Sequence, residues 1–148
     1  MSRTDEATPL RLRARDLPTL ARIVALWPVA AVLKRSSPLP RLAETFDAAP
    51  RGGDTPGGAV DPQRAARLVD GALRRAYRHR PGFCVERSLL LFHLLRRGGH
   101  PAHLCFGVAP DDGRLAGHAW VEIDGAPVAE RVDPQARYRP TYVYPERT

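Results

Sequence analysis

The sequence changes its hydrophobic period once, and this change limits the folds that the chain can adopt. Residues 84–97, "CVERSLLLFHLLRR", are apolar on nearly all sides in the middle, which is typical of a helix buried at the centre of a domain. Arg96 and Arg97 suit the last turn of such a helix, and Gly98 is a natural stop. From Ala102 onward, apolar and polar residues alternate instead, as they do in a strand.

The alternating part predicts a small antiparallel sheet. Residues 102–108 and residues 118–123 form two expected strands, separated by the turn residues "PDDG" at 110–113. Asp124-Gly125 is a strong hairpin signal, so residues 126–132 are expected to return as a further strand. A buried helix followed by an antiparallel meander predicts the α+β class, with the central helix packed on the sheet.

Two more helices are expected before the buried one. Leu17 to Lys34 has apolar residues at helical spacing, with Asp16 as its expected cap and Pro28 expected to kink or split it. A second helix is expected to start after Asp61, a good cap, with Pro62 in its first turn.

Proline and glycine separate these two helices. Residues 48–62, "AAPRGGDTPGGAVDP", have the composition of a loop. We therefore expect an N-terminal helical arm over residues 1–47, a linker over 48–60 and a compact domain over 61–148. The residues leave open whether the arm packs on the protein's own core or docks a partner.

The chain is basic, with 23 lysine and arginine side chains against 16 aspartate and glutamate side chains and a net charge of +7. Lys34 is the one lysine, and this composition favours a GC-rich genome over nucleic-acid binding as its cause. Aromatic residues do not alternate with the basic ones, and no nucleic-acid-binding motif is present. We expect no nucleic-acid partner, whereas a peptide or acidic partner is compatible with the charge.

Cysteine usage and hydropathy predict a cytoplasmic protein with reduced thiols. Two cysteines are too few for a disulfide scaffold, and the first 18 residues lack the apolar centre of a signal peptide. The longest uncharged apolar run, Ile23 to Leu33, is shorter than the about 20 residues that cross a bilayer, so no integral membrane segment is expected. Because neither a metal-ligand spacing nor a phosphate loop is present, no metal or other cofactor is expected.

Cys84 and His118 are the residues most suited to catalysis. A cysteine at a helix N-terminus is favoured as a thiolate by the unpaired N–H groups and the helix dipole, and those N–H groups can also hold an oxyanion. A histidine can serve as its base when a carboxylate orients the ring, and Glu130 and Asp133 follow on or after the expected returning strand. Taken singly, each residue is more often structural, and Cys105 within a strand is assigned to packing.

The order of these elements resembles the transglutaminase-like (papain-like) cysteine protease superfamily. The segments "CVERSLLLFHLLRRGGHPAHLCFGV" and "HAWVEIDGAPVAE" resemble more closely the leader peptidase of lasso peptide biosynthesis, and "ARYRP" at 136–140 and "SSPLPRL" at 36–42 extend the similarity. The resemblance implies that Cys84 is the nucleophile, His118 the base and Glu130 the acid. This family more often has Asp at the position of Glu130, and Asp133 is the reserve acid.

The resemblance implies a bacterial peptidase that removes the leader from a ribosomally made precursor peptide. The expected partners are that precursor, a leader-recognition protein and the cyclase that closes the macrolactam. Arg87 and Trp120 are predicted to lie on the substrate side of the site, with a surface role for Arg87 and a core role for Trp120 as the alternatives. Three other functions stay open: a different transglutaminase-like amidase or protease, a catalytically silent binding module, and a basic nucleic-acid-binding protein.

Overall fold

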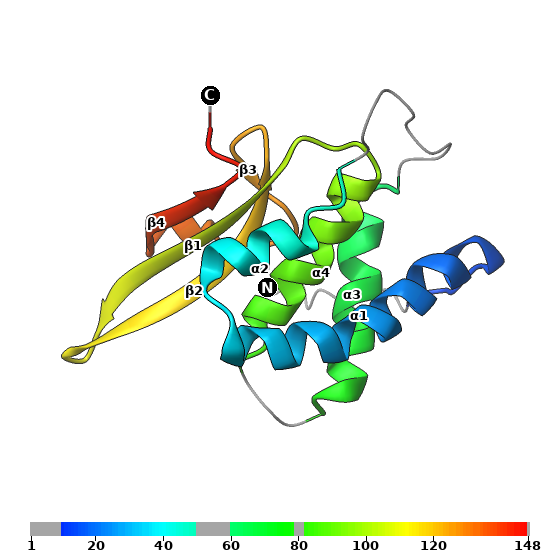
Figure 1. Ribbon diagram of the computed structural model, residues 1–148, viewed down its shortest axis with the longest axis horizontal. Coiled ribbons are helices and arrows are strands. Elements are labelled where there is room, and N and C mark those ends of the chain that lie inside the picture. Colours follow the sequence, from blue (N-terminus) through cyan, green and yellow to red (C-terminus); the bar gives the residue numbers. More distant parts are fainter. Residues whose placement is uncertain (1–9, 50–59, 79–81, 148) are drawn as a thin grey trace, which may run out of the picture.

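The computed structural model describes residues 10–49, 60–78 and 82–147, and Figure 1 shows a helical layer on one side and a sheet on the other. In chain order the elements are η1 (Ala14–Asp16), α1 (Leu17–Ser36), α2 (Leu39–Phe46), α3 (Pro62–Ala76), α4 (Cys84–Arg97), β1 (Ala102–Asp111), β2 (Arg114–Ile123), β3 (Ala126–Pro127), η2 (Pro134–Ala136) and β4 (Arg139–Tyr144). The sheet is antiparallel with the order β3-β2-β1-β4. The α+β prediction is therefore confirmed.

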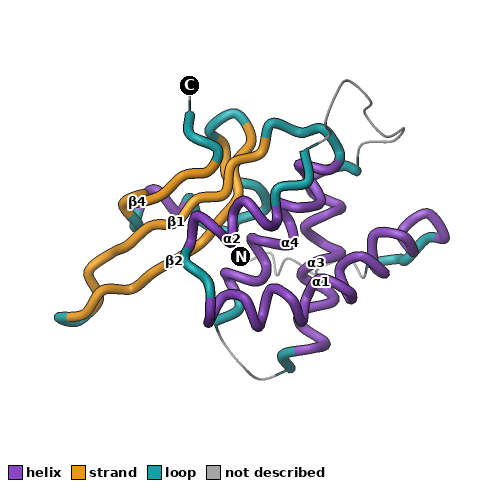
Figure 2. The backbone as a smooth tube through the Cα atoms, in the orientation of Figure 1, coloured by secondary structure: helices purple, strands orange, loops and turns teal. Residues whose placement is uncertain are grey.

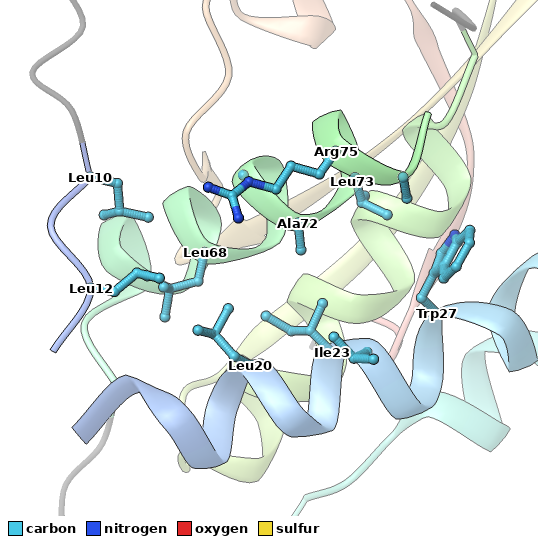
Figure 3. Close-up of a pocket in the computed structure, with 12 residues that line it drawn as sticks. Leu10, Leu12, Leu20, Ile23, Trp27, Leu68, Ala72, Leu73 and Arg75 are labelled. Atoms are coloured by element: carbon cyan, nitrogen blue, oxygen red, sulfur yellow. The ribbon is translucent and has the colours of Figure 1, made fainter. Parts of the chain in front are cut away.

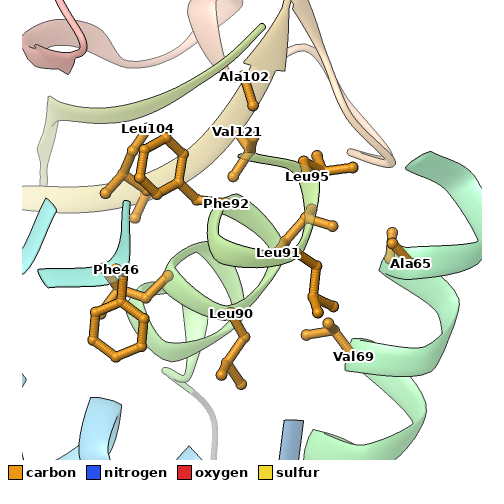
Figure 4. Packing of buried hydrophobic residues seen from close by; sticks show 14 of the residues in the cluster. Phe46, Ala65, Val69, Leu90, Leu91, Phe92, Leu95, Ala102, Leu104 and Val121 are labelled. Atoms are coloured by element: carbon orange, nitrogen blue, oxygen red, sulfur yellow. The ribbon is translucent and has the colours of Figure 1, made fainter. Parts of the chain in front are cut away.

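Helix α4 lies between the other helices and the sheet, as its apolar sequence predicts. Leu89, Leu90, Leu91, Phe92 and Leu95 are fully or almost fully buried. In Figure 4, Phe92 points toward strand residues Leu104 and Val121, while Leu91 points toward Val69 of α3. The first residue of α4 is thereby held at a fixed place beside the sheet.

Strands β1 and β2 form a long hairpin that extends beyond the helical layer (Figure 2). Asp124 and Gly125, both with positive φ, make the tight turn that follows β2, as expected. The predicted returning strand over residues 126–132 is wrong beyond its first two residues. Only Ala126 and Pro127 pair with β2, and the chain then turns away at Ala129, whose φ is 53°.

The fourth strand, β4, pairs with β1 at the opposite edge from β3, and it was not predicted. Helix α2 falls within the expected helical arm over residues 1–47, but a separate helix at its position was not predicted. Both are short segments that begin near prolines and gain their apolar surroundings only after packing. Leu42, Ala43 and Phe46 of α2 are buried in the common core.

Helix α1 is continuous through Pro28, so the expected split does not occur. Pro28 removes one helical hydrogen bond, the one to the carbonyl of Val24, and both residues lie on the exposed side, where water can satisfy that carbonyl. Asp16 precedes the helix but makes no side-chain cap; its carboxylate instead binds Arg64 of α3.

The N-terminal arm shares one hydrophobic core with the rest of the chain through Ile23 and Ala30 of α1. Lys34 also forms an ion pair with Glu86, which is fully buried near the start of α4. Residues 50–59 of the predicted linker lie outside the described residues. Among the residues that the structure describes, Ala14–Ser36 is the one helical stretch long and apolar enough, by length and composition, to cross a membrane, and 17% of its most apolar part is buried.

Candidate active site

Cys84 is the first residue of α4, and no side chain caps this helix. Gly82, two residues earlier, has a φ of 94°, which glycine adopts without the steric cost that other residues meet. Cys84 is partly buried, and it belongs to the first helical turn, whose backbone N–H groups have no partner within the helix. The predicted position of Cys84 at a helix N-terminus is therefore what the structure has.

His118 lies on β2, opposite Gly107 of β1, and two aromatic rings hold its imidazole. The ring stacks on Trp120, with centroids 5.9 Å apart, and on Tyr138, with centroids 5.1 Å apart. Tyr138 was missed by sequence reasoning, although it lies within the "ARYRP" segment. Its position beside His118 depends on the path of the chain between β3 and β4, for which the sequence has no local signal.

Trp120 is fully buried, so its ring has no surface to offer a substrate. The indole N–H donates to Glu122 at 2.8 Å, and the carboxylate of Glu122 also pairs with Arg147. The predicted substrate-side role of Trp120 thus does not fit its burial, and its role is to support His118. Glu122, two residues after Trp120 on the same strand, is fully buried and already paired with Arg147.

Gly107 makes room for this stacking. A Cβ on Gly107 would lie 2.9 Å from a carbon of the Trp120 ring and 2.9 Å from the carbonyl oxygen of Arg139. Both distances are shorter than carbon atoms tolerate, and neither a buried indole nor a strand backbone can move freely. Glycine at this position lets Trp120 lie flat under His118.

Cys84 and His118, 34 residues apart in the chain, meet in the fold, and each shifts the pKa of the other. Burial raises the pKa of the Cys84 thiol, but hydrogen bonds from the His118 side chain and the Ala119 backbone N–H, together with the imidazolium charge, bring that pKa below its ordinary value. The bonds that His118 makes to Cys84 and then to Glu130 raise the pKa of His118 to about 9. Each group therefore favours the charged form of the other, so their contact stabilises a thiolate–imidazolium pair.

Glu130 is the carboxylate next to His118. Its Oε2 lies 3.5 Å from Nε2 of His118. The reserve acid Asp133 is exposed. Its side chain accepts a hydrogen bond from the backbone N–H of Gln135 at 3.0 Å and thereby caps the start of η2. The structure thus brings Cys84, His118 and Glu130 together, whereas Asp133 lines the same cleft but is bonded to Gln135 and not to His118.

Arg87, one turn after Cys84, joins three segments. Its Nε donates to Oδ1 of Asp70 at 2.6 Å, its Nη1 to Oε1 of Glu130 at 3.1 Å and its Nη2 to the carbonyl of Ala129 at 3.1 Å. The guanidinium is therefore occupied by the protein's own groups. Its substrate-side role is a prediction that this bonding does not favour.

A cleft of about 600 Å³ opens over these residues, between α3, the start of α4, β2 and residues 129–138. Cys84, His118 and Glu130 line it, together with Arg74, Arg131 and Tyr138. A larger cavity of about 720 Å³ lies elsewhere, between α1 and α3. The described residues contain no group of three or more His, Cys, Asp or Glu that could hold a metal ion.

Comparison with known protein families assigns the chain to a superfamily. A sequence profile of the transglutaminase-like superfamily matches residues 8–143. The chain belongs to this superfamily. No curated protein and no solved structure matches the sequence.

Members of the transglutaminase-like superfamily are in general cysteine peptidases and transferases, so the predicted superfamily and its broad chemistry are supported. The matched range includes α1 and α2 as well as the sheet, so the transglutaminase-like domain comprises nearly the whole chain. Within this domain, a cysteine thiol at a helix start, an imidazole and a carboxylate lie in one cleft. That arrangement can transfer an acyl group from a peptide or amide to the cysteine.

Proposed function

We propose that this protein is a cysteine peptidase that removes the leader from a lasso peptide precursor. The observation that carries the proposal is the array of Cys84, His118 and Glu130 in an open cleft, with the electrostatics of a thiolate–imidazolium pair. The resemblance of residues 81–140 to the leader peptidases of lasso peptide biosynthesis supplies the substrate. The precursor, a leader-recognition protein and the cyclase are the proposed partners.

In the first half of the reaction, the Cys84 thiolate attacks the carbonyl carbon at the junction of leader and core. A C–S bond forms, and the carbonyl electrons move to oxygen, where the N–H of Cys84 at the start of α4 can stabilise the charge. His118, protonated on the nitrogen that faces Cys84, then donates its proton to the leaving amine. The C–N bond breaks, the core peptide departs, and the leader stays on Cys84 as a thioester.

In the second half, the now neutral His118 takes a proton from water, and the resulting hydroxide attacks the thioester. The C–S bond breaks, the leader leaves as a carboxylic acid, and the thiolate–imidazolium pair is restored. Glu130 holds the ring in one orientation through Nε2 and stabilises its positive charge. Tyr138 and Trp120 restrict the ring from the sides.

The test is cleavage of the cognate precursor in the presence of its leader-recognition protein, followed by mass spectrometry. We expect one cut at the leader–core junction, and we expect Cys84→Ala and His118→Ala to abolish it. Cys105→Ala, which removes the other thiol, is the matched control and should keep the cut. Before assay, each variant is checked for folding by circular dichroism.

Two results would point elsewhere. Thiol-dependent cleavage of unrelated peptides, with no preference for the junction, would indicate a general transglutaminase-like protease or amidase. An intact precursor, with binding of the leader-recognition complex demonstrated, would indicate a silent module that delivers or holds the peptide.

A further inference from the structure

The outer face of α1 is apolar along most of the helix. Leu17, Val24 and Val32 are 62%, 64% and 65% exposed, and Val29 lies between them at 40%. The remaining exposed residues from Leu17 to Leu33 are alanines and prolines, so no exposed charge interrupts the face. A contiguous exposed apolar surface of this kind marks a site of contact with another protein or with a membrane.

The inner face of α1 is fixed to the protein. Ile23 and Ala30 are buried in the common core. Asp16 at one end binds Arg64, and Lys34 near the other end binds the buried Glu86. Because both ends are tied to the same domain, the helix cannot leave it to cross a bilayer and has to meet any apolar phase lengthwise.

An apolar groove continues this face toward α3. Its volume is about 720 Å³, and its walls include Leu12, Val24, Trp27 and Ala72. Figure 3 shows Leu20 and Ile23 of α1 pointing toward α3, with Leu12 at one end of the groove and Trp27 at the other. Val24 and Leu12 are exposed and also line the groove, so the groove and the helix face form one surface.

The charges beside this surface have one sign. Arg11, Arg13 and Arg15 are exposed before the helix, and Arg35 is exposed at its end. Residues 17–43 contain no acidic residue, and Asp16 is neutralised by Arg64. An apolar strip with basic residues at its ends is complementary to anionic headgroups above acyl chains.

We infer that the face of α1, with Arg11, Arg13 and Arg15, rests on an anionic lipid surface. The helix lies in the plane of the interface, with its valines among the acyl chains and its arginines beside the headgroups. A second copy of the chain fits less well, since antiparallel pairing of two α1 helices sets the basic start of one against Arg35 of the other. This inference does not depend on the proposed peptidase activity.

The test is flotation of the full chain with vesicles of phosphatidylglycerol and phosphatidylcholine in equal amounts, compared with phosphatidylcholine alone. We expect the protein to float with the anionic vesicles, and binding to weaken as salt rises. Val24→Glu combined with Val32→Glu should abolish flotation, whereas Leu115→Glu, at an exposed apolar site on β2, should leave it unchanged. Thermal unfolding shows whether each variant is folded.

A second variant addresses the charges without touching the apolar face. Replacing Arg11, Arg13 and Arg15 by Gln should weaken binding by about 5-fold per arginine, roughly 100-fold in total. An unbound wild type, or a folded valine variant that floats like wild type, would overturn the inference. So would light scattering that shows a wild-type dimer converted to a monomer by the valine substitutions, because the occupant would then be a second copy.

Discussion

Arg87 and Glu130 form an ion pair at 3.1 Å, and the second carboxylate oxygen of Glu130 faces His118. The candidate acid beside His118 is thus itself held by an arginine on the same helix as Cys84, the proposed nucleophile. Arg87 is in turn held by Asp70 of α3. These contacts make the distance between His118 and Glu130 depend on the packing of α3 and α4.

Replacing Arg87 by Met should lower kcat for precursor cleavage by about 10- to 100-fold with little change in KM, because Glu130 loses its support while the substrate surface stays. The Arg87→Lys variant should keep only part of the wild-type kcat, since an ammonium group cannot bridge the three partners. Steady-state kinetics on the three proteins makes the comparison. Arg67→Met, at an exposed arginine of α3, is the control; a rise in KM alone would instead assign Arg87 to substrate binding.

Substituting the two candidate acids separates their roles. Glu130→Gln should lower kcat by about 100-fold or more, because the ring loses the charge that stabilises imidazolium. Asp133→Asn should cost far less, because Asn can still accept the N–H of Gln135. Single-turnover cleavage measures both; a larger loss from Asp133→Asn would exchange the two assignments.

The pH dependence of cleavage follows from the thiolate–imidazolium pair. Activity should fall above about pH 9, where His118 loses the proton that it gives to the leaving amine, and again in acid, below the lowered pKa of Cys84. In Cys84→Ala the pKa of His118 should move down toward 6.5, because the Cys84 bond is the largest cause of its rise. NMR titration of the imidazole checks this, and an unchanged pKa near 9 would contradict the pairing.

Alkylation should distinguish the two cysteines. At pH 7, iodoacetamide should modify Cys84 and spare Cys105, because burial and the nearby Glu122 raise the pKa of Cys105 to about 12. Mass spectrometry of the digested protein counts the adducts. His118→Ala should slow the reaction of Cys84 at pH 7; equal rates in both proteins would mean that the imidazole does not activate the thiol.

Gly107→Ala should destabilise the protein by about 1–3 kcal/mol, because the new Cβ overlaps the Trp120 ring and a strand carbonyl. Displacement of Trp120 should also lower activity through His118. The matched control is Gly117→Ala on β2, where the nearest atom to a new Cβ is 3.9 Å away. Thermal unfolding compares the two, and equal stabilities would show that Trp120 moves without cost.

Local patterns were enough to predict the parts of the fold that contain Cys84 and His118. Helix α4 matched its expected range because an apolar helix between glycines has clear boundaries, and the β1–β2 hairpin followed from alternation and its turns. Strand β4 and helix α2 have neither a clear period nor clear ends in the sequence. Pro28 predicted a kink or a split in α1, and only the folded structure shows that the helix continues and that the lost hydrogen bond faces water.

The sequence alone determined that Cys84 begins a buried helix and that His118 lies on a strand, since both depend on periodicity within about ten residues. Tertiary structure decided which carboxylate meets His118, because Glu130 and Asp133 are three residues apart and only the turn at Ala129 and the bonds of Arg87 choose between them. It also decided that Tyr138 and Trp120 hold the ring and that α1 has one buried and one exposed apolar face. Such choices rest on distances between side chains far apart in the chain, and hydrophobic periodicity carries no information about those distances.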